Sequence, residues 1–187
     1  MTAGGSVMRK LRVSSFISLD GVIESPMTWT MPFFDDESKE YAYEQLADVE
    51  FLLLGRMTYE LFSARWSQIK GDQYFDRING LKKLVASRTL IDATWNASVI
   101  PGEVPAALRA LKEQDGGTIM KYGISQLDRT LLANKLVDEY SLWIVPTVVH
   151  QGKRAFEDAG TSVPKLDLVD VRRFNSGSAI LRYRPQY

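Results

Sequence analysis

The chain has 187 residues, of which 45% are hydrophobic and 25% charged, a composition typical of a globular protein with one sizeable core. Its 23 lysines and arginines balance its 23 aspartates and glutamates, so it has no basic excess that would bind nucleic acid or an anionic membrane. It contains no cysteine, which excludes disulfides, thiolate nucleophiles and cysteine-based metal sites.

Residues 1–8 are predicted to form a flexible leader, because this segment is small and lacks the apolar core of a signal peptide. Residues 9–187 are expected to form one domain. No apolar run is long enough to span a bilayer. The lack of cysteine fits a reducing compartment, and we expect a cytoplasmic protein.

The predicted elements begin with a strand over 11–19, in which apolar residues alternate, and which ends in an Asp-Gly turn. A loop rich in proline, methionine and tryptophan follows over 24–34. A helix then runs to about residue 48, and Asp35 or Asp36 is expected to cap it.

The later part of the chain continues this alternation and then changes character. In order, it contains a strand over 51–54, helices over 58–62 and 73–79, strands over 83–86 and 98–100, a helix over 103–114, a strand over 118–121, a helix over 125–133, and strands over 136–144, 166–174 and 178–183. The last two strands flank Asn175-Ser176-Gly177, a hairpin signal. The sequence therefore predicts an α/β fold with a mixed, mainly parallel sheet, helices on both faces and an antiparallel C-terminal edge.

Two strand ends carry the strongest functional signal. In the first, a buried strand stops at Gly55, and Arg56 precedes a helix that is expected to begin near Thr58 as its cap. Free N–H groups and the positive end of a helix dipole favour a phosphate at such a turn, and the arginine adds a full charge. The second strand end repeats this pattern with Ser87 and Arg88. The pair predicts a ligand that carries more than one phosphate.

Several segments of the chain resemble a known superfamily. Those similar to dihydrofolate reductases are Gly55-Arg56-Met57-Thr58-Tyr59-Glu60, Val85-Ala86-Ser87-Arg88 and Trp29-Thr30-Met31-Pro32. Those similar to the reductase domain of the bifunctional riboflavin-biosynthesis deaminase/reductase are Ser18-Leu19-Asp20-Gly21, Leu136-Val137-Asp138-Glu139-Tyr140, Pro146 and Gly152-Lys153-Arg154-Ala155-Phe156. The chain is identified as a stand-alone member of the dihydrofolate-reductase-like superfamily, of the riboflavin-reductase type.

This resemblance implies a three-layer αβα fold, NADPH as the hydride donor and a homodimer. It implies that the cofactor's phosphates are bound by Gly55, Arg56, Thr58, Ser87 and Arg88, with the arginines near the 2′-phosphate. The Rossmann fingerprint is absent from the sequence, so a dinucleotide would bind in another way.

The family's third phosphate loop is altered in this chain. Of its two glycines only Gly123 remains, and Tyr122 and Ile124 are expected to crowd the place where a backbone must approach a pyrophosphate. Ser125 is expected to cap the following helix and to donate to a phosphate. Cofactor binding is therefore predicted at Gly123 and Ser125, with the crowding as an obstacle.

For the substrate, Asp20 is the candidate catalytic residue, either orienting the substrate or relaying a proton, because it ends a strand at the edge where α/β sheets bind ligands. The alternative is that it only forms a turn. Trp29 is a candidate to cover a flat ring. Lys121, Lys153 and Arg154 are the candidates to bind a substrate phosphate.

Two other chemistries are disfavoured. Phe34 occupies the place where dihydrofolate reductases carry the acid that binds the pterin, and a shift of one residue along a helix turns a side chain by about 100°, so Asp35 and Asp36 are poor substitutes. His150 is the single histidine of the chain, and no metal site is predicted.

The sequence therefore predicts an NADPH-dependent reductase of a small heterocyclic or carbonyl/imine substrate. The leading specific activity is the riboflavin-pathway reduction of 5-amino-6-(5-phosphoribosylamino)uracil. A non-catalytic nucleotide-binding protein that retains the fold is the alternative, favoured by the altered loop at Gly123; a folate reductase is disfavoured by Phe34. A homodimer is expected to cover the late hairpin, and no nucleic acid or membrane partner is expected.

Overall fold

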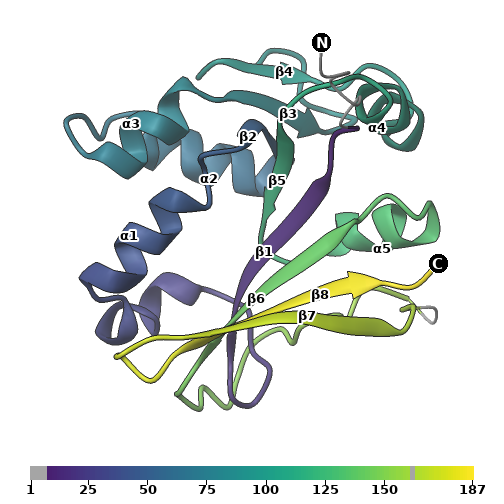
Figure 1. The fold of residues 1–187 in the computed structure, drawn as a ribbon. Coiled ribbons are helices and arrows are strands. Elements are labelled where there is room, and N and C mark those ends of the chain that lie inside the picture. Colours follow the sequence, from purple (N-terminus) through teal and green to yellow (C-terminus); the bar gives the residue numbers. More distant parts are fainter. Residues whose placement is uncertain (1–7, 161–162) are drawn as a thin grey trace, which may run out of the picture.

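A computed structural model describes residues 8–160 and 163–187 of the protein (Figure 1). Except for Met8, the predicted leader lies outside the described residues. The strands are β1 (Leu11–Ser18), β2 (Val49–Gly55), β3 (Lys82–Ala86), β4 (Ala97–Val99), β5 (Thr118–Tyr122), β6 (Glu139–Val145), β7 (Leu166–Arg173) and β8 (Ala179–Pro185). The helices are α1 (Asp36–Glu44), α2 (Arg56–Trp66), α3 (Gln73–Gly80), α4 (Val104–Lys112) and α5 (Gln126–Ala133), with short 3₁₀ turns at Pro26–Thr28 and Met31–Phe33.

The strands form one eight-stranded sheet in the order β4-β3-β2-β5-β1-β6-β8-β7. From β4 to β6 all neighbouring strands run parallel, whereas β8 is antiparallel to both β6 and β7. The predicted mixed, mainly parallel sheet with an antiparallel C-terminal edge is confirmed.

Helices cover both faces of the sheet (Figure 1). On one face, apolar residues of α2 and α3 pack on β2, β3 and β5, and α1 packs on β6 and β8. On the other face α4 and α5 pack on the central strands. The run Leu52-Leu53-Leu54 is buried on both faces, as its unbroken apolar pattern predicts. The three-layer αβα arrangement follows.

Local capping explains two helix starts. The Asp35 carboxylate accepts a hydrogen bond from Ser38 N at 2.9 Å, so the predicted cap of α1 is confirmed. Ser125 is the N-cap of α5, also as predicted. The predicted cap at Thr58 is wrong, because α2 begins at Arg56 and Gly55 is its N-cap.

Two strand boundaries also differ from the prediction. Strand β6 begins at Glu139 rather than at Leu136, since Asp138 is used in a contact: its carboxylate accepts a hydrogen bond from Leu11 N at 2.7 Å. Strand β1 ends at Ser18, and Leu19 is 62% exposed rather than on the buried face of a strand.

The strand register determines where the ends of the strands lie. Gly55 pairs with Ala86, so β2 and β3 end at the same level. Lys121 pairs with Leu53, which brings the residue after β5 to that level as well. Strand β1 leaves β5 at Ser14, opposite Tyr122, and continues beside β6 to Ser18. The carboxyl edge of the sheet therefore has a step, at which β1 and β6 extend beyond β5, β2 and β3.

Candidate functional site

We call the ends of β2, β3 and β5 the lower level of this step and the ends of β1 and β6 its upper level. Three turns lie next to one another at the lower level. They follow β2, β3 and β5, which are neighbours in the sheet, and they contain Gly55–Thr58, Ser87-Arg88 and Gly123–Ser125. All predicted cofactor-binding residues belong to these turns. The sequence suggests that two of the turns are alike, and the register brings all of them together at one edge.

Arg56 connects the first two turns. Its Nε donates to Glu60 Oε1 at 2.8 Å, and its Nη1 donates to Thr89 Oγ1 at 2.6 Å. The Ser87 hydroxyl accepts hydrogen bonds from the backbone N–H groups of Thr89 at 3.2 Å and Leu90 at 3.0 Å. The Ser87 proton stays available for a phosphate oxygen, because a hydroxyl both accepts and donates. Sequence reasoning missed Thr89, since its contact with Arg56 depends on strand pairing.

Arg88 differs from Arg56 in that its guanidinium has no hydrogen-bond or ion-pair partner among the described residues. It is exposed beside the Ser87 turn. Thr58 is half-buried as the third residue of α2. The turns thus combine a positive group that is engaged, one that is unengaged, and hydroxyls near a helix N-terminus.

The glycines leave open space in the first and third turns. Gly55 has an ordinary φ of −72°, and a Cβ built there would have no atom within 4 Å. Backbone strain therefore does not require glycine at this position, and what its missing side chain provides is room. Gly123 has a φ of +74°, which favours glycine, and its surroundings are equally open.

The predicted crowding of the third turn is wrong. Tyr122 lies among the aromatic residues of α2 and α3, and its hydroxyl accepts a hydrogen bond from Tyr74 at 3.0 Å. Ile124 is 8% exposed and packs into the core on the opposite face. Both side chains leave Gly123 free, because β5 ends at Tyr122 and the left-handed turn at Gly123 sends Ile124, two residues on, to the other face.

Burial raises the pKa of both tyrosines of this pair, to about 12 for Tyr74. Both phenols therefore stay protonated at neutral pH and remain hydrogen-bond donors. The sequence contains no local sign of this contact, because Tyr74 and Tyr122 belong to distant segments.

Lys121 lies in the interior rather than at a surface. Its side chain is 2% exposed, and its ammonium donates to Asp128 Oδ2 at 2.6 Å and to the carbonyl of Gly123. This placement does not favour the predicted contact of Lys121 with a substrate phosphate.

Asp20 lies on the upper level of the step, away from the three turns. Strand β1 extends about 10 Å beyond the level of Gly123, since Ser18 is three residues past it and each residue of a strand adds about 3.3 Å. Asp20 therefore lies at the carboxyl edge of the sheet, as expected, but beyond the level at which the cofactor turns end. The cause is the length of β1, which the sequence alone does not relate to that of β5.

The Asp20 carboxylate organises two loops. It accepts hydrogen bonds from Ser18 Oγ at 2.6 Å, from Val149 N at 3.1 Å and from His150 N at 2.8 Å. The hydrogen bond from Ser18, followed by those from the backbone, lowers the pKa of Asp20 from its usual 3.8. The carboxylate is thus ionised at neutral pH and holds the loop after β6 against the loop after β1.

Lys153 and Arg154 lie in the loop after β6, and Trp29 follows the loop after β1 and is bonded to it. Trp29 Nε1 donates to the carbonyl of Glu24 at 2.9 Å. Lys153 forms an ion pair with Asp158, and the Arg154 guanidinium donates to the carbonyl of Asp20. We call the loops over 19–25 and 146–158 the platform. Their cross-links make it one unit on the upper level of the step.

An aromatic cluster lies beside the platform on the face covered by α1. The ring centroids of Phe16 and Phe34 are 5.9 Å apart, and each ring packs on Trp143. Phe34 therefore contributes to an apolar wall where a folate reductase would carry an acid. Asp35 is used as the cap of α1 and Asp36 pairs with Lys39 on the surface, so neither replaces that acid.

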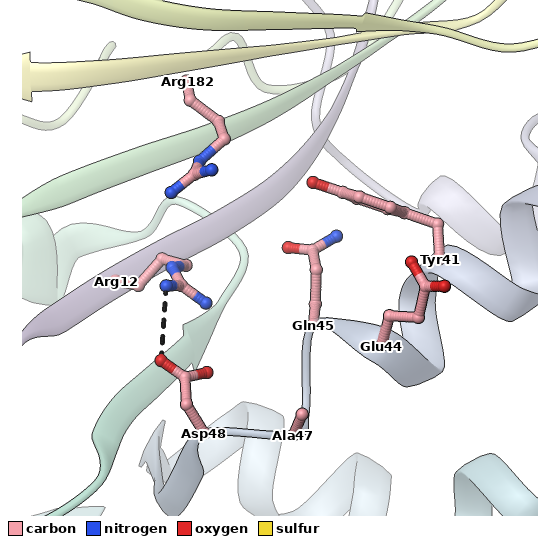
Figure 2. A pocket seen from close by; sticks show the side chains of 7 residues that line it. All are labelled: Arg12, Tyr41, Glu44, Gln45, Ala47, Asp48 and Arg182. Carbon is pink, nitrogen blue, oxygen red and sulfur yellow. Dashed lines mark ion pairs between the residues drawn. The ribbon is translucent and has the colours of Figure 1, made fainter.

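A hollow of about 300 Å³ lies elsewhere, between the end of α1 and the starts of the central strands (Figure 2). Figure 2 shows that Arg12 and Arg182 approach it from the sheet, and Tyr41 and Gln45 from α1. Both arginines pair with Glu139. None of the predicted site residues lines the hollow.

Two further features bear on function. The described residues contain no group of three His, Asp or Glu side chains close enough to hold a metal ion. Within 8–160 and 163–187, no helix has the length and apolar character needed to cross a membrane.

A family model described as the RibD C-terminal domain matches residues 9–180. The chain belongs to the RibD C-terminal domain family. It is 27% identical to the uncharacterized protein YyaP of Bacillus subtilis (strain 168), over 94% of each chain. The predicted family is therefore confirmed.

Solved structures at lower identity share the fold. A putative riboflavin biosynthesis protein from Shewanella sp. PV-4 is similar with a TM-score of 0.69 and 14% identity, over 95% of this chain and 99% of that one. The deaminase/5-amino-6-(5-phosphoribosylamino)uracil reductase of Thermotoga maritima matches with a TM-score of 0.68 and 16% identity, over 96% of this chain but 57% of that one. Dihydrofolate reductase from Enterococcus faecalis complexed with NADP(H) matches with a TM-score of 0.63 and 15% identity, over 95% and 97%. The predicted dihydrofolate-reductase-like fold is confirmed.

The contacts of Asp20 predict how stability depends on pH. Because its pKa is lower in the folded protein than its usual 3.8, its contribution is complete above about pH 4 and is lost as the pH falls below that value. Asp20→Asn should lower the melting temperature at pH 7, and the difference from the unmutated protein should shrink towards pH 3. Calorimetry across this range tests it, with Asp92→Asn as the exposed control. An equal loss at every pH would contradict a role for the ionised carboxylate.

Proposed function

We propose that this protein is an NADPH-dependent reductase that transfers hydride to a small heterocyclic or carbonyl/imine substrate. The observation that carries the proposal is the alignment of the three turns after β2, β3 and β5, joined by the hydrogen bond from Arg56 to Thr89. The family supports a reductase, because solved structures of the same fold include a pyrimidine reductase-like protein and a uracil reductase. A neighbour of the same fold was solved with NADP(H).

The residues of the turns fit a dinucleotide that carries several phosphates. The open space at Gly55 and Gly123 lets a pyrophosphate approach the N-terminus of α2 and the backbone of the third turn, where the N–H groups of Gly123 and Ser125 already donate to Ser14 O and Asp128. The Ser87 hydroxyl and the unengaged Arg88 guanidinium suit the extra phosphate of NADPH. When bound, the cofactor supplies the hydride, and the protein orients the reacting groups.

The step in the sheet suggests where the substrate binds. Beyond Ser14, β1 has no strand on its β5 side among the described residues, so its backbone forms a short open edge at Phe16, before Ser18, whose N–H and carbonyl are bonded to Val22 and Gly21. Such an edge can hydrogen-bond the amide-like groups of a flat ring, as a strand pairs with a strand. Phe16 and Phe34 lie on one side of this edge and supply an apolar wall. A neutral heterocycle fits this arrangement better than a charged pterin does.

Asp20 acts in this proposal as a positioning residue rather than as an acid. Its lowered pKa leaves no proton to donate at neutral pH, so water supplies the proton of the reduction. Its hydrogen bonds to Val149 and His150 hold the platform over the substrate edge. Lys153 and Arg154 lie on the same platform, and we assign them to a phosphate of the substrate. For this reason 5-amino-6-(5-phosphoribosylamino)uracil stays the leading substrate.

A non-catalytic nucleotide-binding protein is the second candidate. It is favoured by the carboxylates of this region, because Asp20 and Asp35 are both engaged in structural hydrogen bonds. Both candidates bind NADPH. Only the enzyme oxidises it in the presence of a substrate, which the loss of nicotinamide absorbance reports.

The unengaged Arg88 predicts a preference for NADPH over NADH. A charge-assisted hydrogen bond to the 2′-phosphate is worth about 1.5–3 kcal/mol, or roughly tenfold to over a hundredfold in affinity. Arg88→Ala should weaken NADPH binding by a factor in this range and leave NADH binding nearly unchanged. Fluorescence titration with both cofactors measures this, and Arg65→Ala, an exposed arginine later in α2, is the control. Equal affinities of the unmutated protein for NADPH and NADH would refute the assignment.

We also propose a homodimer that covers the β7 edge. Leu168, Val169 and Val171 are 52%, 43% and 50% exposed around the bulge in this edge strand. An exposed apolar edge strand needs cover, and a two-fold dimer is the commonest way to provide it. Light scattering at micromolar concentration should give twice the chain mass of 21.1 kDa, and Val171→Lys should halve it. Val148→Lys, at a 51% exposed valine outside the edge, should not change it. A monomer mass for the unmutated protein would exclude the dimer.

A further inference from the structure

A buried ion pair lies beneath the third turn. The ammonium of Lys121 contacts Asp128 Oδ2 at 2.6 Å, and the two side chains are 2% and 0% exposed. It is the most deeply buried ion pair among the described residues. Lys121 is the penultimate residue of β5, and Asp128 is in the first turn of α5, so the pair spans the chain reversal between the strand and the helix.

The pair holds both ends of this reversal. Lys121 also donates to the carbonyl of Gly123. Asp128 Oδ2 accepts hydrogen bonds from Ser125 N at 2.7 Å and from Ser125 Oγ at 3.4 Å. The carbonyl at one end and the amide at the other are therefore drawn inward. A Cβ built at Gly123 would have no atom within 4 Å, so the Lys121 and Asp128 side chains do not fill the space on that side of the turn.

Stability alone does not explain this arrangement. Burial lowers the pKa of Lys121, and the charge of Asp128 opposes that shift. The attraction between the two charges therefore offsets the cost of removing them from water, a cost that two apolar side chains would not have. Replacing buried ion pairs by apolar residues of similar volume is often neutral for stability. What apolar residues cannot reproduce is the directed contact with Gly123 and Ser125.

We infer that Lys121 and Asp128 are positioning residues, which hold the Gly123–Ser125 turn in the shape that admits the cofactor's pyrophosphate. The inference rests on the proposed function for the identity of the ligand. The rigidity of the turn does not depend on that function, because the pair makes all its contacts within the unliganded chain.

The test replaces the pair by apolar residues in the double variant Lys121→Met/Asp128→Leu. Its melting temperature should stay close to that of the unmutated protein. The amides of Gly123 and Ser125 should exchange with solvent about tenfold faster or more in the ligand-free protein. NADPH binding should weaken by about tenfold. Lys112→Met is the matched control, since it removes another lysine–aspartate pair, with Asp138, at the far end of β6.

The readouts separate the two hypotheses. Unchanged amide exchange in the double variant would overturn the inference, whether or not NADPH binds. Faster exchange with unchanged NADPH affinity would also overturn it, because the turn would then not serve the cofactor. Failure of the unmutated protein to bind NADPH would contradict the proposed function, and with it the positioning role. If the double variant does not fold, Asp128→Asn, which keeps the shape and removes the charge, must give the same faster exchange and weaker binding.

Discussion

The unequal length of neighbouring parallel strands is the constraint on which the site depends. Strands β2, β3 and β5 end level with one another, so the three turns that follow them meet at one edge. Strand β1 runs on from Ser14 to Ser18 with β6 alone, and exposes a strand edge above those turns. A ligand with phosphates at one end and a flat ring at the other matches this step. The arrangement follows from backbone pairing, and side chains only refine it.

Charged groups stabilise the two levels of the step in different ways. On the lower level, Arg56 joins two turns on the surface, and the Lys121–Asp128 pair holds the third from inside the protein. On the upper level, the Asp20 carboxylate binds backbone N–H groups and joins two loops. Asp20 and the Lys121–Asp128 pair thus orient backbone groups, whereas Arg56 joins side chains at an exposed surface. Arg88 has no hydrogen-bond or ion-pair partner among the described residues, and it is therefore the arginine that we assign to the ligand.

Much of this fold is predictable from local pattern. The unbroken apolar run Leu52-Leu53-Leu54 indicates a strand buried on both faces, and the caps Asp35 and Ser125 mark helix starts by their own hydrogen bonds. What could not be predicted depends on pairing between distant segments. The level of Asp20 relative to the turns, the direction of Tyr122 and the interior position of Lys121 are set by register and by partners elsewhere in the chain. The roles of individual site residues remain predictions.

The most direct measurement of the central claim is a map of backbone amide shifts as NADPH is added to isotope-labelled protein. We expect the largest amide shifts at Gly55–Thr58, Ser87-Arg88 and Gly123–Ser125. The shifts in all three turns should follow one binding curve with the same dissociation constant, because one ligand spans the three turns. Shifts confined to the hollow around Arg12, Tyr41 and Gln45, or no shifts at millimolar NADPH, would contradict the claim that the stepped edge binds the cofactor.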